Sequence, residues 1–552
     1  MNNSINNGVK LFELKKYHES LEIFQNLLKN DPMNIKVLMY TSFNLMFLKK
    51  FENAIKILNQ ILKLNSNIAD VNFNIALCYQ NLNDYENAVE NYESAIKKNP
   101  NYHQAYINLG VLFKNLERFE DSIEIYKKAL NNKVNYEEIY INLSEVYKIL
   151  KNYSLAKQSA ESALKVNSQS VLALNNLGIA YIDEGDQKEA IKILENSKKI
   201  NPNYFMTHSN LGIAYRYAGE YAKAEEAYKN SIRLNPNYHD AYFNLGQIQL
   251  SEGDFINGWQ NYEHRWGKLQ KRPVRLDFNK PIWNPKLGYK RLLIWGEQGI
   301  GEQILFSTIL FDLINLFEEI LILIDDRLCP LYQSSFPKIK VLKKSEKIDE
   351  SLFDYHIPIC SLGLFFRKTI EDFKSPEKVF EINLKKHNGK KRRCALSWIS
   401  TNSDTGYSKS MTLEDLLPIL QLDDIEFYNI QYTNEDNLVK EFCKKNGVSI
   451  HKIENLDTFN DLEGLINFIG ECDFTITVSN TNAHLSASIG QTTYLLLPKE
   501  VGKFWYWENE VNNKNLWYPS IKKITQTTKQ NWFDPIETLK IFYLKILILK
   551  RH

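Results

Sequence analysis

The stretch Arg291-Leu-Leu-Ile-Trp-Gly-Glu-Gln-Gly-Ile-Gly-Glu-Gln-Ile-Leu-Phe306 predicts a buried strand, a glycine loop and a helix in immediate succession. Its apolar first part forms the expected strand, the loop carries Gly296, Gly299 and Gly301, and the helix begins near Glu302. Glycines allow the backbone to turn tightly and to approach a ligand closely. The N–H groups at the start of a helix can meet an anion. The stretch therefore predicts an α/β fold with a candidate binding loop after its first strand.

Length and composition describe an ordinary globular protein. The chain has 552 residues, too many for one hydrophobic core, so roughly two to four domains are expected. A net charge of +2 gives no indication of a nucleic-acid partner. The six cysteines show no metal-ligand spacing, and no apolar run reaches the length of a membrane span. Because the first residues also lack a signal-peptide pattern, we expect a cytoplasmic protein with no metal and no transmembrane segment.

The sequence before about residue 265 repeats with a period of 34 residues, so that Asn176-Leu-Gly-Ile-Ala-Tyr181 returns as Asn210-Leu-Gly-Ile-Ala-Tyr215. Two series of small residues share this period, which lets paired helices pack closely: Gly8, Ser42, Ala76, Gly110, Ser144, Gly178, Gly212 and Gly246, and Ser20, Ala54, Ala88, Ser122, Ala156, Ala190, Ala224 and Gly258. These residues resemble the tetratricopeptide repeat family. The resemblance implies an all-α superhelix with a concave groove over residues 1–268, with seven full repeats and a partial eighth. Trp259 and Trp266 predict that the eighth unit packs on the next domain.

Asparagines recur two residues before the small positions of the first series, at Asn74, Asn108, Asn142, Asn176, Asn210 and Asn244. Asparagine is not favoured inside a helix, so helix propensity does not select it. An amide offers a donor and an acceptor, which suits pairing with an extended peptide backbone. The series resembles the ladder of the nucleocytoplasmic O-linked N-acetylglucosamine transferases, which implies a protein or peptide acceptor in the groove. Hydrogen bonding between helices of the array is the alternative.

After residues 281–285 the period stops, and short apolar strands alternate with helical segments. This alternation predicts parallel sheets whose faces are covered by helices. The expected strands are residues 292–295, 320–324, 341–342, 355–359, 395–399, 426–430, 474–478 and 493–497. A basic linker at 385–393 separates two sets, so we expect two Rossmann-like domains at residues 285–388 and 391–552. Ligands of such folds bind outside the carboxyl ends of the strands, which predicts a cleft between the domains.

Two segments carry a second resemblance. Gly299-Ile-Gly-Glu302 and Val478-Ser-Asn-Thr-Asn-Ala-His-Leu-Ser-Ala-Ser-Ile-Gly490 resemble motifs of the heptosyltransferase-like glycosyltransferases, which have the two-domain GT-B fold. Trp517-Tyr-Pro-Ser520 is similar to a segment of repeat-fused members of that family. The resemblance implies metal-independent transfer of a sugar from a nucleotide-sugar substrate to an acceptor hydroxyl, with no further cofactor.

The chain departs from the family pattern at two places. Glu302 replaces an aspartate, which keeps a carboxylate, whereas Ser479-Asn480 replace Asp-Thr, which removes a charge. The second departure favours an alternative, a non-catalytic repeat scaffold whose transferase half is a binding module. A third alternative is an enzyme that acts on cell-surface glycan or lipid precursors and uses its repeats for assembly. Fold alone does not decide among the three.

Glu302 is the candidate general base for the acceptor hydroxyl, and stabilisation of a helix N-terminus is its alternative role. Candidate donor-binding residues are Gly299, Gly301, Ser397, Thr401, Lys409, Asn480, Thr481, Asn482 and His484. Lys409 would neutralise charge on the leaving diphosphate, unless it is a solvated lysine. Asn480–Asn482 would hold the diphosphate at a helix start or simply cap that helix. His484 would reach a phosphate or pack in the core, and the aromatic residues 504–507 would stack on a sugar or belong to the core.

Overall fold

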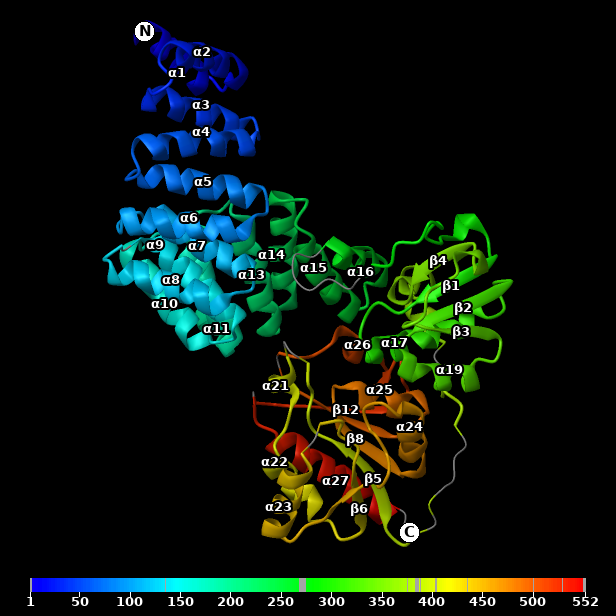
Figure 1. Ribbon diagram of the computed structural model, residues 1–552. Coiled ribbons are helices and arrows are strands. Elements are labelled where there is room, and N and C mark those ends of the chain that lie inside the picture. Colours follow the sequence, from blue (N-terminus) through cyan, green and yellow to red (C-terminus); the bar gives the residue numbers. More distant parts are fainter. Residues whose placement is uncertain are drawn as a thin grey trace. The chain divides into compact units, whose positions relative to one another are not determined.

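The computed structural model describes residues 2–134, 136–267, 275–374, 376–382, 387, 389–402, 405–433, 435–499, 501–528 and 530–549 (Figure 1). The chain divides into two compact units, Met1–Asn210 and Leu211–His552. The first unit is all-helical, and the second contains the last repeats together with two parallel sheets. No helix within these described ranges is both long enough and apolar enough to cross a membrane.

Helices of the first unit pack on their neighbours along the chain (Figure 1). They are α1 (Asn2–Glu13), α2 (Tyr17–Asn30), α3 (Ile35–Phe47), α4 (Phe51–Leu64), α5 (Ala69–Asn81), α6 (Tyr85–Lys98), α7 (His103–Asn115), α8 (Phe119–Asn131), α9 (Glu137–Ile149), α10 (Tyr153–Val166), α11 (Val171–Glu184) and α12 (Gln187–Ile200). α13 (Phe205–Tyr217) crosses the division between the units. Each pair of helices corresponds to one period of the sequence, as predicted.

The two series of small residues meet inside the helix pairs. A Cβ atom on Gly178 would stand 2.6 Å from Leu194 Cγ, so only glycine allows α11 and α12 to approach this closely. Ser122 Oγ of α8 donates to the carbonyl oxygen of Gly110 in α7 at 2.8 Å. Such contacts satisfy the hydroxyl where it is buried, and they explain why serine is tolerated at some of these positions.

The repeats of the second unit continue into α14 (Tyr221–Leu234), α15 (His239–Ser251), the short α16 (Phe255–Tyr262) and the 3-10 helix η1 (Glu263–Gly267). Trp259 of α16 is 1% exposed and belongs to the same buried cluster as Ile304 and Trp505 of the α/β part. The prediction that the eighth unit packs on the next domain is therefore confirmed. Because the last repeats pack on the α/β part, they are grouped with it in the second unit, and the division between the units lies within the repeat array. The domain boundary expected near 268 adjoins residues 268–274, which lie outside the described ranges.

The first sheet has the order β3-β2-β1-β4 with parallel pairing throughout. Its strands are β1 (Arg291–Trp295), β2 (Glu319–Ile324), β3 (Ile339–Lys343) and β4 (Tyr355–Pro358). Its helices are η2 (Pro285–Leu287), α17 (Ile300–Phe306), η3 (Ser307–Ile309), α18 (Leu310–Leu313), η4 (Asp326–Leu328), α19 (Cys329–Ser335), η5 (Glu350–Leu352), η6 (Ile359–Leu362), α20 (Gly363–Phe366) and η7 (Ile370–Asp372). The four strands expected in this half are confirmed, with ends that differ by one or two residues.

The second sheet has the order β12-β9-β8-β5-β6-β7 and is also parallel. Its strands are β5 (Arg392–Ser397), β6 (Ile425–Asn429), β7 (Ile450–Lys452), β8 (Phe474–Val478), β9 (Thr493–Leu497) and β12 (Ile521–Thr525), and β10 (Glu510–Val511) pairs with β11 (Lys514–Asn515) in a separate hairpin. Its helices are α21 (Gly406–Lys409), α22 (Leu413–Leu420), α23 (Asp436–Asn446), α24 (Leu462–Glu471), α25 (Thr481–Ser488), α26 (Trp505–Glu508) and α27 (Phe533–Leu549). The four expected strands are confirmed here too, whereas β7 and β12 were not expected. Residues 385, 386 and 388 of the basic linker lie outside the described residues, and Arg392 and Arg393, which were assigned to the linker, belong to β5.

Candidate functional site

A pocket of about 220 Å³ lies where three segments of the second unit meet, each following the carboxyl end of a strand. The segments are the glycine loop after β1, the loop after β5 and the start of α25 after β8. The pocket is lined by Gly299, Ile300, Gly301, Glu302, Ser400, Thr401, Asn402, Lys409, Tyr432, Ser479, Asn480, Thr481, His484, Phe504 and Tyr506. Eight of the ten predicted catalytic and donor-binding residues are in this lining, and Ser397 and Asn482 lie behind it.

Glu302 lies in the first turn of α17, whose N-cap is Gly299. Tyr506 Oη donates to Glu302 Oε1 at 3.5 Å, so the carboxylate is held toward the aromatic wall of the pocket. Burial raises the pKa of Glu302, against the opposing effects of its own backbone N–H, of Lys409 and of Tyr506. A carboxylate with a raised pKa is a stronger base than an exposed one, which suits removal of a proton from a hydroxyl.

Lys409 supplies the positive charge of the pocket. Its side chain is 1% exposed, and Nζ stands 4.4 Å from the ring centroid of Phe504. Burial lowers the pKa of Lys409 to about 8, although Glu302 acts to raise it. Its Nζ forms no hydrogen bond or salt bridge with another residue in the described ranges. A buried ammonium without such a partner is costly, and an anionic ligand would supply the missing partner.

Asn480 is the N-cap of α25, and its Oδ1 accepts from the backbone N–H groups of Asn482 and Ala483 at 3.0 and 3.4 Å. Its Nδ2 donates to Ser397 Oγ at 2.8 Å and to the carbonyl oxygen of Ile399 at 3.0 Å. The helix-capping role considered for this residue is therefore present. Both polar atoms of the side chain are used inside the protein, so Asn480 shapes the pocket from its edge.

Ser397 and Asn482 belong to the same buried network. Ser397 Oγ donates to Gln431 Oε1 at 2.7 Å and accepts from Asn482 Nδ2 at 3.1 Å. Asn482 Nδ2 also donates to the carbonyl oxygen of Ile430 at 2.9 Å. The network ties the ends of β5 and β6 to α25, and it leaves Thr481 as the member of residues 480–482 whose side chain is available at the pocket.

His484 of α25 is 3% exposed, and its ring lies against Gly301 of α17. Its ring centroid lies 4.8 Å from that of Trp507, and Nδ1 lies 3.3 Å from Tyr518 Oη. Burial lowers the pKa of His484 to about 3, and Lys409 adds to this effect. The imidazole is therefore neutral at physiological pH. It offers a packed ring and, at most, one neutral hydrogen-bonding nitrogen to a ligand.

Tyr432 lines the pocket but was not singled out from the sequence. Tyr432 follows β6, and its Oη accepts from the backbone N–H and the hydroxyl of Thr401, each at 3.3 Å. Of the aromatic segment 504–507, which was singled out, Phe504 and Tyr506 line the pocket, whereas Trp505 and Trp507 belong to the buried core behind it. The position of Tyr432 after a predicted strand was the one signal that could have identified it.

The acidic pair at the end of β2 serves local structure. Asp325 accepts from Arg327 Nε at 2.8 Å, and Asp326 Oδ1 accepts from the backbone N–H of Ser345 at 3.2 Å. Within the ranges that the structure describes, no three His, Cys, Asp or Glu side chains are grouped so that they could hold a metal ion.

The asparagine series is divided in its contacts. Asn210 is buried, and its Nδ2 donates to Asn175 Oδ1 at 2.8 Å, while Asn176 Nδ2 donates to the carbonyl oxygen of Ile141 at 3.3 Å. These two side chains make the interhelical bonds considered as the alternative to peptide binding. Asn74 and Asn142 are partly exposed and form no such bond with another described residue.

Models of the tetratricopeptide repeat family match residues 69–102, 103–133, 137–170, 171–204, 206–238 and 227–260. The N-terminal half of the chain therefore contains tetratricopeptide repeats, as predicted. Such arrays form extended concave surfaces that bind other proteins or peptides.

Three individual proteins are similar to parts of this chain. The chain is similar to protein FlbA of Caulobacter vibrioides, with 24% identity over 301 residues, which are 50% of this chain and 50% of that protein. It thus spans about half the length of that relative. Similar solved structures include the C-terminal part of a repeat protein from Cytophaga hutchinsonii, with 19% identity over 44% of this chain and 99% of that chain and a TM-score of 0.37. YrrB, a TPR protein with an unusual peptide-binding site, has 22% identity over 33% of this chain and 95% of that chain, with a TM-score of 0.29.

Proposed function

We propose that this protein is a glycosyltransferase that moves a sugar from a nucleotide-sugar donor to an acceptor hydroxyl, and that its repeats capture a protein or peptide acceptor. One observation carries the proposal. Glu302, Lys409 and the start of α25 line the same pocket, at the carboxyl ends of two parallel sheets. The resemblance of residues 299–302 and 478–490 to heptosyltransferase-like enzymes of the GT-B fold supports the same reaction.

In the proposed reaction the acceptor oxygen forms a bond to the anomeric carbon while the bond from that carbon to the donor diphosphate breaks. Glu302 takes the proton of the acceptor hydroxyl, for which its raised pKa is suited. The electron pair of the broken bond leaves with the diphosphate. Lys409 and Thr481, at the start of α25, are the lining residues that would neutralise and hold this growing negative charge.

The departure at Ser479-Asn480 does not remove the local structure that the family motif would provide. Asn480 caps α25 through two backbone N–H groups, as a threonine at this position would through its hydroxyl. Ser479 Oγ accepts from Trp507 Nε1 at 2.9 Å, so this side chain also has a defined partner. Despite the lost charge, the pocket has a capped helix start and a cation, which supports an active enzyme over a non-catalytic scaffold.

A thermal-shift screen against nucleoside diphosphates and nucleotide sugars tests the proposal, because a ligand of the folded state raises the melting temperature. We expect one nucleotide to raise it in the wild type and to have little effect in Lys409→Met. We also expect release of the nucleoside diphosphate from the matching sugar donor. Binding without release would favour the scaffold alternative, and transfer to a lipid-linked but not to a protein acceptor would favour the precursor-modifying alternative. No shift with any nucleotide would refute donor binding.

A further inference from the structure

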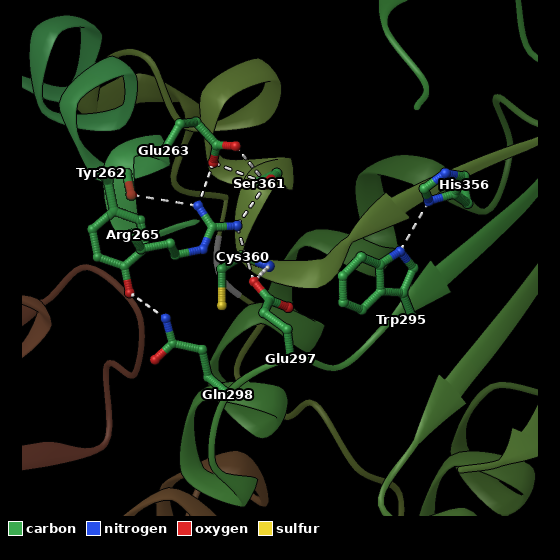
Figure 2. Close-up of polar contacts among 9 residues, drawn as sticks. All are labelled: Tyr262, Glu263, Arg265, Trp295, Glu297, Gln298, His356, Cys360 and Ser361. Atoms are coloured by element: carbon green, nitrogen blue, oxygen red, sulfur yellow. Dashed lines mark hydrogen bonds and ion pairs between the residues drawn. The ribbon is translucent and has the colours of Figure 1, made fainter. Parts of the chain in front are cut away.

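The last turn of the repeat array is tied to the glycine loop by a buried ion pair. Arg265 of η1 is 1% exposed, and its Nη2 donates to Glu297 Oε1 at 3.0 Å and to Ser361 Oγ at 2.7 Å. Its Nη1 donates to Glu263 Oε1 at 2.5 Å. Figure 2 shows the guanidinium group between these three side chains. Arg265 is thus fixed on both sides, by the repeat array and by the α/β part.

Two successive residues of the loop are held from the repeat side. Glu297 Oε1 also accepts from the backbone N–H of Cys360 at 3.3 Å, and Gln298 Nε2 donates to Tyr262 Oη at 3.1 Å. Figure 2 shows both contacts beside Arg265. Gln298 continues the connection, because its carbonyl oxygen accepts from Gln303 Nε2 at 2.9 Å. The chain of contacts therefore runs from η1 through the loop to the helix that carries Glu302.

A buried ion pair such as Arg265–Glu297 is expected to add little net stability to the fold. Glu297 is 6% exposed, and its Oε2 and Arg265 Nε lack hydrogen-bond partners among the described atoms. Buried ion pairs often contribute less stability than apolar side chains of the same size, since both ions must be removed from water. The pair is better explained by the geometry that it imposes on the loop than by the stability that it adds.

We infer that Arg265 and Glu297 are a positioning pair, which fixes the glycine loop so that the Glu302 carboxylate faces the pocket. The inference rests on the proposed function, in which Glu302 takes the acceptor proton. Neither residue of the pair lines the pocket, so they act through the loop. A displacement of about 1 Å at a reacting group can cost on the order of 100-fold in rate.

Neutralising both members of the pair separates positioning from stability. Arg265→Met leaves Glu297 as an uncompensated buried charge and should lower the unfolding midpoint, whereas Arg265→Met combined with Glu297→Gln should restore most of it. We expect turnover of the double variant to stay about 10–100-fold below that of the wild type, with the KM for the donor little changed. Amide hydrogens of residues 296–303 should exchange roughly tenfold faster, while those of β8 and α25 should not change.

Arg265→Lys is the second variant, because it keeps the charge but cannot reproduce the forked contacts of arginine. It should fold and show the same loss of turnover. Arg265→Lys therefore tests the positioning role even if the double variant does not fold. A matched control neutralises a different buried arginine, Arg367, which donates to Asp312 Oδ2 at 2.6 Å and to the carbonyl oxygen of Thr308, beyond the end of α17, at 3.1 Å. Arg367→Met with Asp312→Asn should leave turnover and exchange of residues 296–303 unchanged.

The two proposals fail in different ways. Wild-type protein that releases no nucleoside diphosphate would refute the proposed reaction, and the exchange experiment would still decide whether the pair positions the loop. Unchanged loop exchange together with wild-type turnover in the double variant would overturn the positioning role.

Discussion

Gly301 lies against the imidazole of His484, so closely that a Cβ atom on Gly301 would stand 2.7 Å from His484 Cδ2. The contact joins α17, which follows β1 of the first sheet, to α25, which follows β8 of the second, and Figure 1 shows these helices next to each other. The last glycine of the loop is therefore required for packing between the two helices. Glu302, the residue after Gly301, and Thr481, three residues before His484, line the same pocket.

Gly301→Ala should destabilise the protein by roughly 1–3 kcal/mol, because the added methyl group meets a buried ring that cannot move without disturbing its neighbours. Gly299→Ala is the matched control, since Gly299 has an ordinary φ of −62° and its Cβ would approach only the end of the Glu302 side chain, at 3.0 Å. Denaturant unfolding of both variants measures the difference. Equal losses would contradict a packing role that is specific to Gly301.

Lys409 should make nucleotide affinity depend on pH. Its pKa of about 8 means that the ammonium form dominates below this pH and is lost as the pH rises through it. Binding of a nucleoside diphosphate should therefore weaken above about pH 8, by up to tenfold for each pH unit, as the lysine must then be protonated on binding. Calorimetric titration between pH 6.5 and 9.5 tests this, with ~0.1 M salt held constant. In Lys409→Met the affinity should be lower and flat over this range, and a flat profile in the wild type would exclude Lys409 as the phosphate partner.

The same lysine should reduce stability. Its pKa in the folded protein is below the value of about 10.4 in an unfolded chain, so the unfolded state binds more protons between these values. Stability is therefore lost as the pH falls from about 10.4 to 8, and at neutral pH the cost is on the order of 3 kcal/mol. We expect Lys409→Met to melt higher than the wild type at pH 7 and to lose this advantage near pH 10, measured by thermal unfolding at both pH values. A variant that melts lower at pH 7 would show that the ammonium has a stabilising partner.

The fold could be predicted from the sequence because its signals are local. A period of 34 residues and short apolar runs determine helix pairs and strands without knowledge of distant neighbours, and all eight expected strands are present. β7 and β12 were missed because Ile450–Lys452 and Ile521–Thr525 carry lysines on partly exposed strands, which weakens the apolar signal.

The site could be predicted only as a set of residues near strand ends. That Glu302, Lys409 and Thr481 share one pocket follows from the rule for parallel sheets. The use of Asn480 and Asn482 inside the protein depends on Ser397, more than 80 residues away, and no local pattern indicates such a contact. Arg265 was missed for the same reason.

The asparagine series should separate into two classes on substitution. Asn210→Ala should cost about 1–3 kcal/mol, because it leaves the buried amide of Asn175 without its donor. Asn74→Ala with Asn142→Ala should leave the unfolding midpoint unchanged or slightly raised, since alanine is the better helix former. Urea unfolding of each variant tests this, and loss of binding to a random peptide library in the Asn74/Asn142 variant alone would support the groove. A large loss of stability in that variant would show that these amides are structural as well.

Cutting the chain before α13 should give two folded fragments. Residues 205–552 keep Trp259, Tyr262 and Arg265 with the α/β part on which they pack, so this fragment should bind nucleotide as the whole chain does. A fragment of residues 275–552 removes these residues and exposes their apolar partners, and we expect it to aggregate or to lose binding. Circular dichroism of residues 1–204 should show almost only helix. Normal binding by the 275–552 fragment would mean that the last repeat is dispensable for the pocket.

Glu302→Gln is the most direct test of the mechanism, because glutamine keeps the size of the side chain but cannot accept the acceptor proton. General-base catalysis typically contributes about 10²–10⁴-fold, so turnover should fall within that range. Donor affinity should barely change, since Lys409 and the start of α25 remain in place. The pKa of Glu302 is raised in the folded protein, so ionisation of its carboxyl group at neutral pH opposes folding. The folded protein is stabilised at low pH, where Glu302 is protonated, and this stabilisation is lost as the pH rises through the raised pKa. The substitution should therefore leave stability at pH 7 equal or higher.

A carboxylate that only stabilises the start of α17 would give the opposite pattern, a loss of about 0.3–1 kcal/mol with turnover nearly intact. Turnover, donor Kd and unfolding midpoint measured on one preparation distinguish the two roles, and a variant that melts lower and still transfers sugar at the wild-type rate would exclude Glu302 as the base.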